Sequence, residues 1–164
     1  MLDHLDYFLP MLHLRPHHLI DIIRNIGQER PVIPHAYGHA QHTITRAMLE
    51  GEINEIRLTI GSDDLCQPCI HLSPEGLCRD LLPQLEYPLR KQQYNDELDR
   101  QVLAFLNLED GVVMRLADFL DLMEDQLEGL TAICTHPKEN MESRKTGMIN
   151  GVDLLRKMYS GRNF

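Results

Sequence analysis

Three of the four cysteines lie in one short stretch, "DDLCQPCIHLSPEGLC". Their spacing is Cys66-x2-Cys69-x8-Cys78, and Cys134 is far away in the sequence. A C-x2-C pair curls the chain so that both sulfurs can face one centre, and a third thiol can reach that centre across a loop that Gly76 helps to turn. The spacing predicts a metal site with one ligand position left to fill.

Cys134 is the natural fourth ligand, because its segment "AICTHP" is also expected to be a loop between helices. His71 and Asp21 are the alternatives. Thiolates select zinc or an iron–sulfur cluster over hard cations. Structural zinc usually shows a second paired motif, whereas three clustered cysteines and a remote one are typical of iron–sulfur proteins. We therefore expect a 4Fe-4S iron–sulfur cluster, with zinc as the alternative metal; otherwise these are ordinary buried or loop cysteines.

A second polar group is "RPHH", which falls at the expected start of a helix. The positive end of the helix dipole disfavours a charged imidazole, so His17 and His18 should be neutral and able to accept a hydrogen bond or bind a metal. Arg15 is suited to hold a carboxylate or phosphate. Asp21, one turn on, is placed to orient a histidine ring. The pattern predicts a pocket for a small anionic ligand; the alternative is an exposed face that caps the helix.

Histidines recur in "PHAYGHAQHTITR". On a helix, His35, His39, His42 and Arg46 form one stripe, which is separate from the apolar stripe of the same segment. Three neutral imidazoles on one face indicate a zinc or iron site, and a solvated polar stripe is the alternative.

The stretch "LRPHHLIDII", followed by "DDLCQPC" and "GLC", resembles the family named domain of unknown function 1284, small bacterial and archaeal proteins. That family opens with L-R-P-H-H-L-L-C, then has D-D-I-C-x-x-C-P, a later cysteine and, in some members, another I-C near the end. The matching positions are Leu14 to Ile20, Asp63, Asp64, Cys66, Cys69, Cys78 and Cys134. Asp21 stands where the family has its first cysteine. The resemblance implies an iron–sulfur centre on these cysteines and no particular reaction.

The elements that must position these residues are mostly helical. A helix is expected from Leu14 to Gly27, since Pro16 suits a first turn and the apolar residues recur at helical spacing. Further helices are expected over 35–49, 94–106, 117–127 and 143–159, and short strands over 54–61 and 111–116. The cysteine loop directly follows the first of these strands. We expect a mainly α protein with a few short strands (α+β), a single compact helical domain with a metal-binding loop.

Three segments are expected along the chain. Residues 1–13 form an N-terminal segment, 14–136 a core domain with the RPHH helix and the cysteine loop, and 137–164 a basic C-terminal helix packed on that core. Residues 138–164 carry six Lys or Arg against three Asp or Glu, although the whole chain has a net charge of −9. Such a basic tail could dock a partner, or it is a solvated helix face.

Charge and hydropathy argue against several classes of protein. The net charge of −9 and the sequence pI of about 5.4 disfavour a nucleic-acid-binding surface. No window approaches a transmembrane length, and the N-terminal stretch does not read as a signal peptide. We expect a cytoplasmic protein, where clustered thiols indicate metal or redox chemistry. The expected partners are a small anionic ligand or a redox partner protein, with no nucleic acid and no membrane.

Three functions fit these patterns. The first is a cytosolic iron–sulfur protein that serves electron transfer, sensing or an enzyme reaction near the RPHH turn. The second is a zinc-stabilised protein- or ligand-binding module. The third is a metal-dependent hydrolase that uses the histidine cluster. The sequence leaves open whether the protein is an enzyme.

Overall fold

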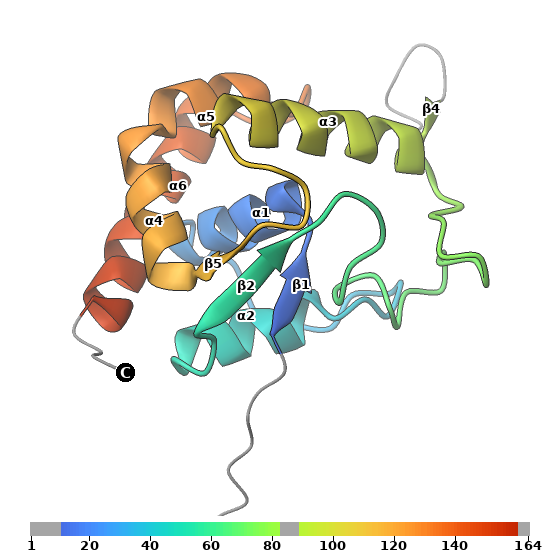
Figure 1. Cartoon of the computed structure of the whole chain (residues 1–164), viewed down its shortest axis with the longest axis horizontal. Helices are drawn as coiled ribbons and strands as arrows, with labels where there is room; N and C mark the ends of the chain where they lie inside the picture. Colours follow the sequence, from blue (N-terminus) through green and yellow to red (C-terminus); the bar gives the residue numbers. More distant parts are fainter. Residues whose placement is uncertain (1–10, 83–88, 161–164) are drawn as a thin grey trace, which may run out of the picture.

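The computed structural model describes residues 11–82 and 89–160. Its helices are α1 (Pro16–Gly27), α2 (Gln41–Leu49), α3 (Lys91–Phe105), α4 (Leu116–Asp125), α5 (Leu127–Ile133) and α6 (Met141–Tyr159). Its strands are β1 (Leu12–Leu14), β2 (Glu55–Leu58), β3 (Leu81–Leu82), β4 (Leu89–Arg90) and β5 (Val113–Arg115). The expected mainly helical α+β fold is confirmed (Figure 1). Most of the N-terminal segment expected over 1–13, and residues 161–164, lie outside the described residues.

A small sheet has β2 at its centre, with β1 on one side and β5 on the other. β1 runs parallel to β2 and pairs Leu14 with Leu58, while β5 is antiparallel and pairs Met114 with Ile56. In β2, Ile56 and Leu58 are fully buried and their neighbours Glu55 and Arg57 are exposed. This alternation is that of a strand with one face on a core.

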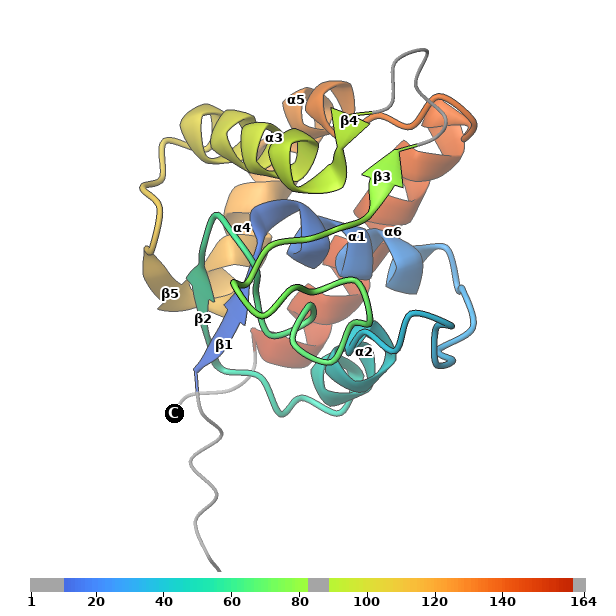
Figure 2. The same cartoon turned by 90° about the vertical axis from the view of Figure 1, so that its right-hand side faces the viewer.

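The parallel pairing of β1 and β2 decides where the chemistry-bearing residues meet. Because both strands end at the same edge of the sheet, the RPHH turn after β1 comes to lie beside the cysteine loop after β2 (Figure 2). Beyond the sheet the two segments stay joined, since Asp64 donates its backbone N–H to the His13 carbonyl and accepts the His13 N–H on its carboxylate, at 3.0 and 2.8 Å. The sequence analysis did not predict β1.

Helix α6 packs closely along α1 through glycines (Figure 1). A Cβ atom on Gly27 would lie 1.8 Å from the Gly147 carbonyl oxygen, and one on Gly151 would lie 2.0 Å from the Ile23 carbonyl oxygen. Only glycine allows the two backbones to approach this closely. Helix α6 also contacts α4 and α5, and its buried residues Met148, Val152 and Leu155 belong to the same hydrophobic core as α1.

Two helix predictions differ from the structure. The helix expected over 35–49 begins only at Gln41, because Gly38 takes a φ of +73°, a conformation that ends or interrupts helices. The helix expected over 117–127 corresponds to α4 but ends at Asp125, and α5, which follows after Gln126, was not predicted. In the described residues no helix is both long and apolar enough to cross a bilayer.

Candidate metal centre

Cys66, Cys69 and Cys78 line one cavity of about 70 Å³. His18, from the first turn of α1, lines the same cavity, as do His39 and His71. A single buried water needs roughly 10–15 Å³ by the same measure, so the cavity has room for a small inorganic group. The structure thus brings three thiols and three imidazoles from separate parts of the chain around one space.

Backbone hydrogen bonds fold the loop that carries the cysteines into successive turns. The Cys66 N–H donates to the Asp63 carbonyl and the Cys69 N–H to the Cys66 carbonyl, at 3.0 and 2.9 Å. Further on, Leu72 and Cys78 form an antiparallel bridge, and Gly76, with a φ of +80°, closes the turn between them. Gly76 therefore helps the loop to turn, as the sequence analysis expected.

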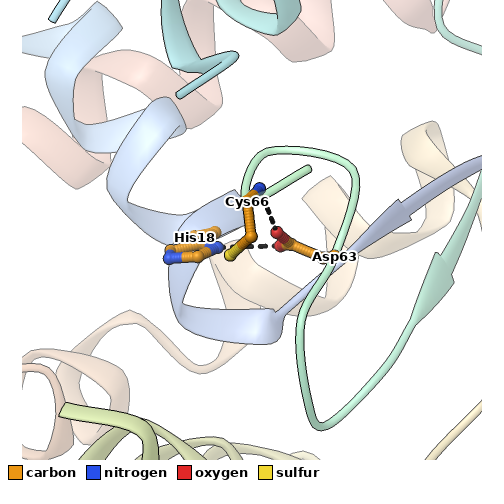
Figure 3. Close-up of side chains that lie close together, drawn as sticks. All are labelled: His18, Asp63 and Cys66. Carbon is orange, nitrogen blue, oxygen red and sulfur yellow. Dashed lines mark hydrogen bonds and ion pairs between the residues drawn. The ribbon is translucent and has the colours of Figure 1, made fainter. Parts of the chain in front are cut away.

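His18, which lines this cavity, forms an oriented pair with Asp63 (Figure 3). The Nδ1 atom of His18 lies 2.8 Å from Oδ2 of Asp63. Burial raises the pKa of Asp63, but the hydrogen bond and charge of His18, the backbone N–H of Arg15 and the side chain of Cys66 outweigh it and lower this pKa to about 2. Burial lowers the pKa of His18, which favours its neutral ring. Because an ionised carboxylate only accepts, that neutral ring carries its hydrogen on Nδ1 and has a free lone pair on Nε2. A carboxylate on one nitrogen and a free lone pair on the other is the usual state of a metal-binding histidine.

Asp63 itself serves as an orienting group. Its side-chain oxygens accept hydrogen bonds from the Arg15 N–H at 2.7 Å, from His18 and from the Cys66 N–H at 3.1 Å. Within residues 11–82 and 89–160, one group of three potential ligand atoms lies within 4.8 Å of one another, and it belongs to His18, Asp63 and Cys66. Since the Asp63 oxygens are already engaged, His18 and Cys66 are the members of this group that remain available to a metal.

Arg15 and His17 belong to a buried ion-pair network. Arg15 is 1% exposed, and its guanidinium donates to Asp99 and Asp96, each at 2.8 Å. The fully buried Asp99 also accepts from the backbone N–H and from Nδ1 of His17, at 3.0 and 2.8 Å. Burial raises the pKa of Asp99, but its contacts with His17 and Arg15 lower it below the usual value. Because its charge is already matched by two carboxylates, Arg15 positions the turn, and this pairing argues against the anion-binding role expected for Arg15 and His17.

Gln92 ties the third cysteine to this network. Its side-chain oxygen accepts from the Cys78 N–H at 2.8 Å, and its amide nitrogen donates to Asp96 at 3.1 Å. Asp96 in turn holds Arg15. The first two turns of α3 therefore fix both the end of the cysteine loop and the RPHH turn.

His35 and His39 lie before α2, so the helical stripe predicted for them and His42 is wrong. Their rings are stacked with centroids 4.5 Å apart. The Tyr37 N–H donates to Nδ1 of His35 at 3.0 Å, and the Gln41 N–H to Nδ1 of His39 at 3.5 Å. A neutral ring that accepts on Nδ1 carries its hydrogen on Nε2, which is then a donor and has no lone pair for a metal. Burial, and next the charge of His35, lower the pKa of His39 to about 4, so its ring is neutral.

The other two predicted histidines lie in different places. His42 is in the first turn of α2 and lines a second cleft, away from the thiols. His71 lines the thiol cavity, and its ring packs edge-on against Tyr37 with centroids 4.2 Å apart. Within the described part of the chain, Nε2 of His71 is buried without a hydrogen-bond partner. An unpartnered nitrogen beside three thiols fits a metal ligand, so His71 remains a candidate beside His18.

The structure separates Cys134 and Asp21 from the thiol cavity. Cys134 directly follows α5 and lies in the hydrophobic core, where it is 5% exposed. Its carbonyl oxygen accepts a hydrogen bond from Arg144. It is not among the residues that line the cavity. Asp21 pairs with Arg24 at 2.6 Å on the next turn of α1. Burial, and then the negative charge of Asp21, raise the pKa of the Cys134 thiol to about 12. The remote cysteine is thus a buried core residue here.

Burial, and then the charge of Asp63, likewise raise the pKa of the Cys66 thiol to about 12. A thiol that stays protonated at neutral pH is a poor nucleophile, and a bound cation is what would convert it to a thiolate. The arrangement around Cys66 is therefore suited to ligation rather than to thiol catalysis.

Sequence reasoning missed the carboxylates that hold the site. Asp99 lies on the buried face of α3 together with Asn95 and Val102. The available signal was that Asp99, Val102 and Leu106 recur at helical spacing, which puts an acid in line with an apolar stripe.

One comparison with known proteins gives a match. The family model described as protein of unknown function (DUF1284) matches residues 35–138. The match includes the four cysteines and begins after the RPHH turn. No curated protein and no solved structure matches this chain.

Proposed function

Because the chain belongs to the DUF1284 family of proteins of unknown function, we propose its function from the site: a metal-binding protein whose centre is held by Cys66, Cys69 and Cys78. His18 is the fourth ligand in this proposal, through Nε2. The observation that carries it is that the three thiols and the Asp63-oriented His18 line one cavity.

An iron–sulfur cluster is the centre that we propose. Sulfurs on one zinc ion, with Zn–S bonds of about 2.3 Å, stand roughly 3.8 Å apart. In the described residues the three thiols form no group within 4.8 Å of one another. A cluster spaces its ligands more widely, because each iron takes its own thiolate. When bound, such a group supplies one-electron redox chemistry, while Asp63 orients His18 and the loop holds the thiols.

Zinc is the second candidate, on a different observation. His18 and Cys66 already place ligand atoms within 4.8 Å of each other. A zinc ion between them, with Cys69 and Cys78 drawn in, would make a three-cysteine, one-histidine site, which is a common structural zinc arrangement. The hydrolase reading has less support, because the His35 and His39 rings each accept a backbone N–H on Nδ1, which leaves a neutral ring without a lone pair for a metal.

The cytoplasm remains the proposed location. Four free cysteines, three of them around one cavity, persist as thiols in a reducing compartment and would be oxidised outside it.

Metal content and colour test this proposal. Protein purified or reconstituted without oxygen should contain iron and acid-labile sulfide and should absorb in the visible range. Replacing Cys66, Cys69 or Cys78 by Ser should remove most of the bound metal, whereas Cys134→Ser, as the matched control, should keep it. Stoichiometric zinc in the absence of sulfide would show that the bound metal is zinc and would rule out the iron–sulfur cluster. Metal-free protein after anaerobic iron–sulfide reconstitution and zinc loading would refute the metal centre itself.

A further inference from the structure

A second and larger cleft lies beside the end of α1. Its walls come from the last turns of α1, from the segment 29–36, from α2 and from α6, and its volume is about 520 Å³. Pockets for small molecules have volumes of roughly 300–1,000 Å³, so this cleft has the size of a ligand site. The metal cavity does not account for it, although His39 lines both.

Most of the wall is apolar. Ile26, Val32, Leu49 and Leu154 contribute side chains to it, and Leu154 is 41% exposed. Ile33, at the same cleft, is 68% exposed. Apolar side chains left in water around a concavity lower the free energy of a complex when an apolar molecule covers them.

Two polar atoms in the wall lack partners. In the described residues, Oδ1 of Asn25 and Nδ1 of His42 are buried and make no hydrogen bond within the protein. Such atoms carry a desolvation cost that a ligand or water can relieve. Asn25 Oδ1 requires a donor, and the His42 ring, whose Nε2 lies 3.3 Å from the Thr43 hydroxyl, can take a donor or an acceptor on Nδ1. A hydroxyl or an amide satisfies both requirements.

The charges around the cleft argue for a neutral ligand. Among described residues, the charged side chains that line it are those of Glu29 and Arg30, both exposed at the rim, and Arg30 pairs with Glu139 at 3.1 Å. An ionised group carried into the cleft would lose water without gaining a buried counter-charge.

We propose that this cleft binds a small neutral molecule with an apolar body and a hydroxyl or amide group, which bonds to Asn25 and His42. This ligand site does not depend on the metal centre, and its test is separate.

Three probes of similar shape test the need for a hydroxyl group and for a neutral ligand. Benzyl alcohol has the hydroxyl, toluene lacks it, and benzoate carries a charge. Ligand-observed NMR on the full chain should show benzyl alcohol binding at least about fivefold tighter than toluene, the value of one net hydrogen bond. Benzoate should bind more weakly than benzyl alcohol.

Two exposed positions on α6 give a matched pair of variants. Leu154→Phe narrows the cleft, whereas Ile149→Phe makes the same kind of change at a residue that is 43% exposed and does not line it. We expect Leu154→Phe to weaken benzyl alcohol binding and Ile149→Phe to leave it unchanged. Asn25→Leu should reduce the preference for benzyl alcohol over toluene. Cys66→Ser should leave binding unchanged, which separates this site from the metal centre. Absence of binding at millimolar benzyl alcohol, equal affinity for toluene, or equal binding by both Phe variants would overturn the proposal.

Discussion

Asp63 holds His18 by a hydrogen bond, with its Oδ2 atom 2.8 Å from Nδ1 of the imidazole. The same carboxylate accepts the backbone N–H of Arg15 and that of Cys66. One side chain therefore sets the ring of a proposed ligand, the start of α1 and the turn that presents the first thiol. Its removal should loosen all three at once.

Asp63→Asn should lower metal affinity. The Asn side chain keeps the shape, but its amide accepts on one atom only and no longer carries the negative charge that favours the Nδ1–H tautomer of His18. Loss of such an orienting group typically costs about 10–100-fold in metal affinity. Competition with a chelator measures the change. Asp64→Asn is the control, because the Asp64 carboxylate accepts the His13 N–H and does not line the cavity. Equal affinities of the two variants would contradict the orienting role.

The fourth ligand can be assigned by comparing three single variants. His18→Ala should reduce bound metal more than His71→Ala, since His18 has both a free Nε2 and an orienting carboxylate. Cys134→Ala should have the smallest effect, because Cys134 is buried in the core away from the cavity. Metal per chain, measured beside the melting temperature, separates ligation from folding. A collapse of metal content in Cys134→Ala with an unchanged melting temperature would restore Cys134 as the ligand.

The local spacing of Cys66, Cys69 and Cys78 was enough to predict that they come together around one cavity, because residues in a single loop need no long-range information. Their meeting with His18 depends on the parallel pairing of β1 with β2. β1 is a three-residue strand, too short for an alternating pattern to be recognised. Similarly, Asp99 and Asp63 come from distant segments, and nothing in the spacing of "RPHH" indicates which carboxylates it will meet.

The histidine stripe failed for a different reason. His35 and His39 are spaced as on a helix, but Gly38 adopts a positive φ and the helix starts after them. Histidines four residues apart also occur in loops, so the spacing of three histidines was weak support for a helix. Cys134 was expected in a loop between helices, but α5 runs to Ile133 and packs Cys134 into the core.

Asp99→Asn should destabilise the protein strongly. The fully buried Asp99 neutralises Arg15 and accepts from His17, so its replacement leaves a buried guanidinium short of one carboxylate. Breaking a buried pair from one side costs about 3–5 kcal/mol. Asp118→Asn is the matched control, because its pair with Arg115 is solvent-exposed and screened by water, so its loss should change stability little. Urea unfolding of both variants without metal measures the difference, and equal losses would show that the buried network carries no special stability.

The pH dependence of stability should reflect Asp63. Its pKa is about 2 in the folded protein, against an ordinary value of 3.8. A lowered carboxylate pKa stabilises the folded state above the ordinary value, and this contribution declines as the pH falls below about 3.8 and is lost as it passes through about 2. The difference in unfolding free energy between the parent chain and Asp63→Asn, without metal, should therefore shrink as the pH falls from about 5 to about 3. A constant difference over that range would contradict the assignment.

The contact between α1 and α6 gives a prediction that is independent of the site. Gly27→Ala would place a Cβ atom 1.8 Å from the Gly147 carbonyl oxygen. Because that oxygen belongs to the backbone of α6, this clash can be relieved only if the two helices move apart. Overpacking of this kind costs about 1–3 kcal/mol or more, and it should lower the melting temperature. Gly129→Ala is the matched control, because its Cβ would meet the ring of Phe105, which is 39% exposed and can rotate away. If both alanine variants have the melting temperature of the parent protein, the helices do not pack as closely as the glycines indicate.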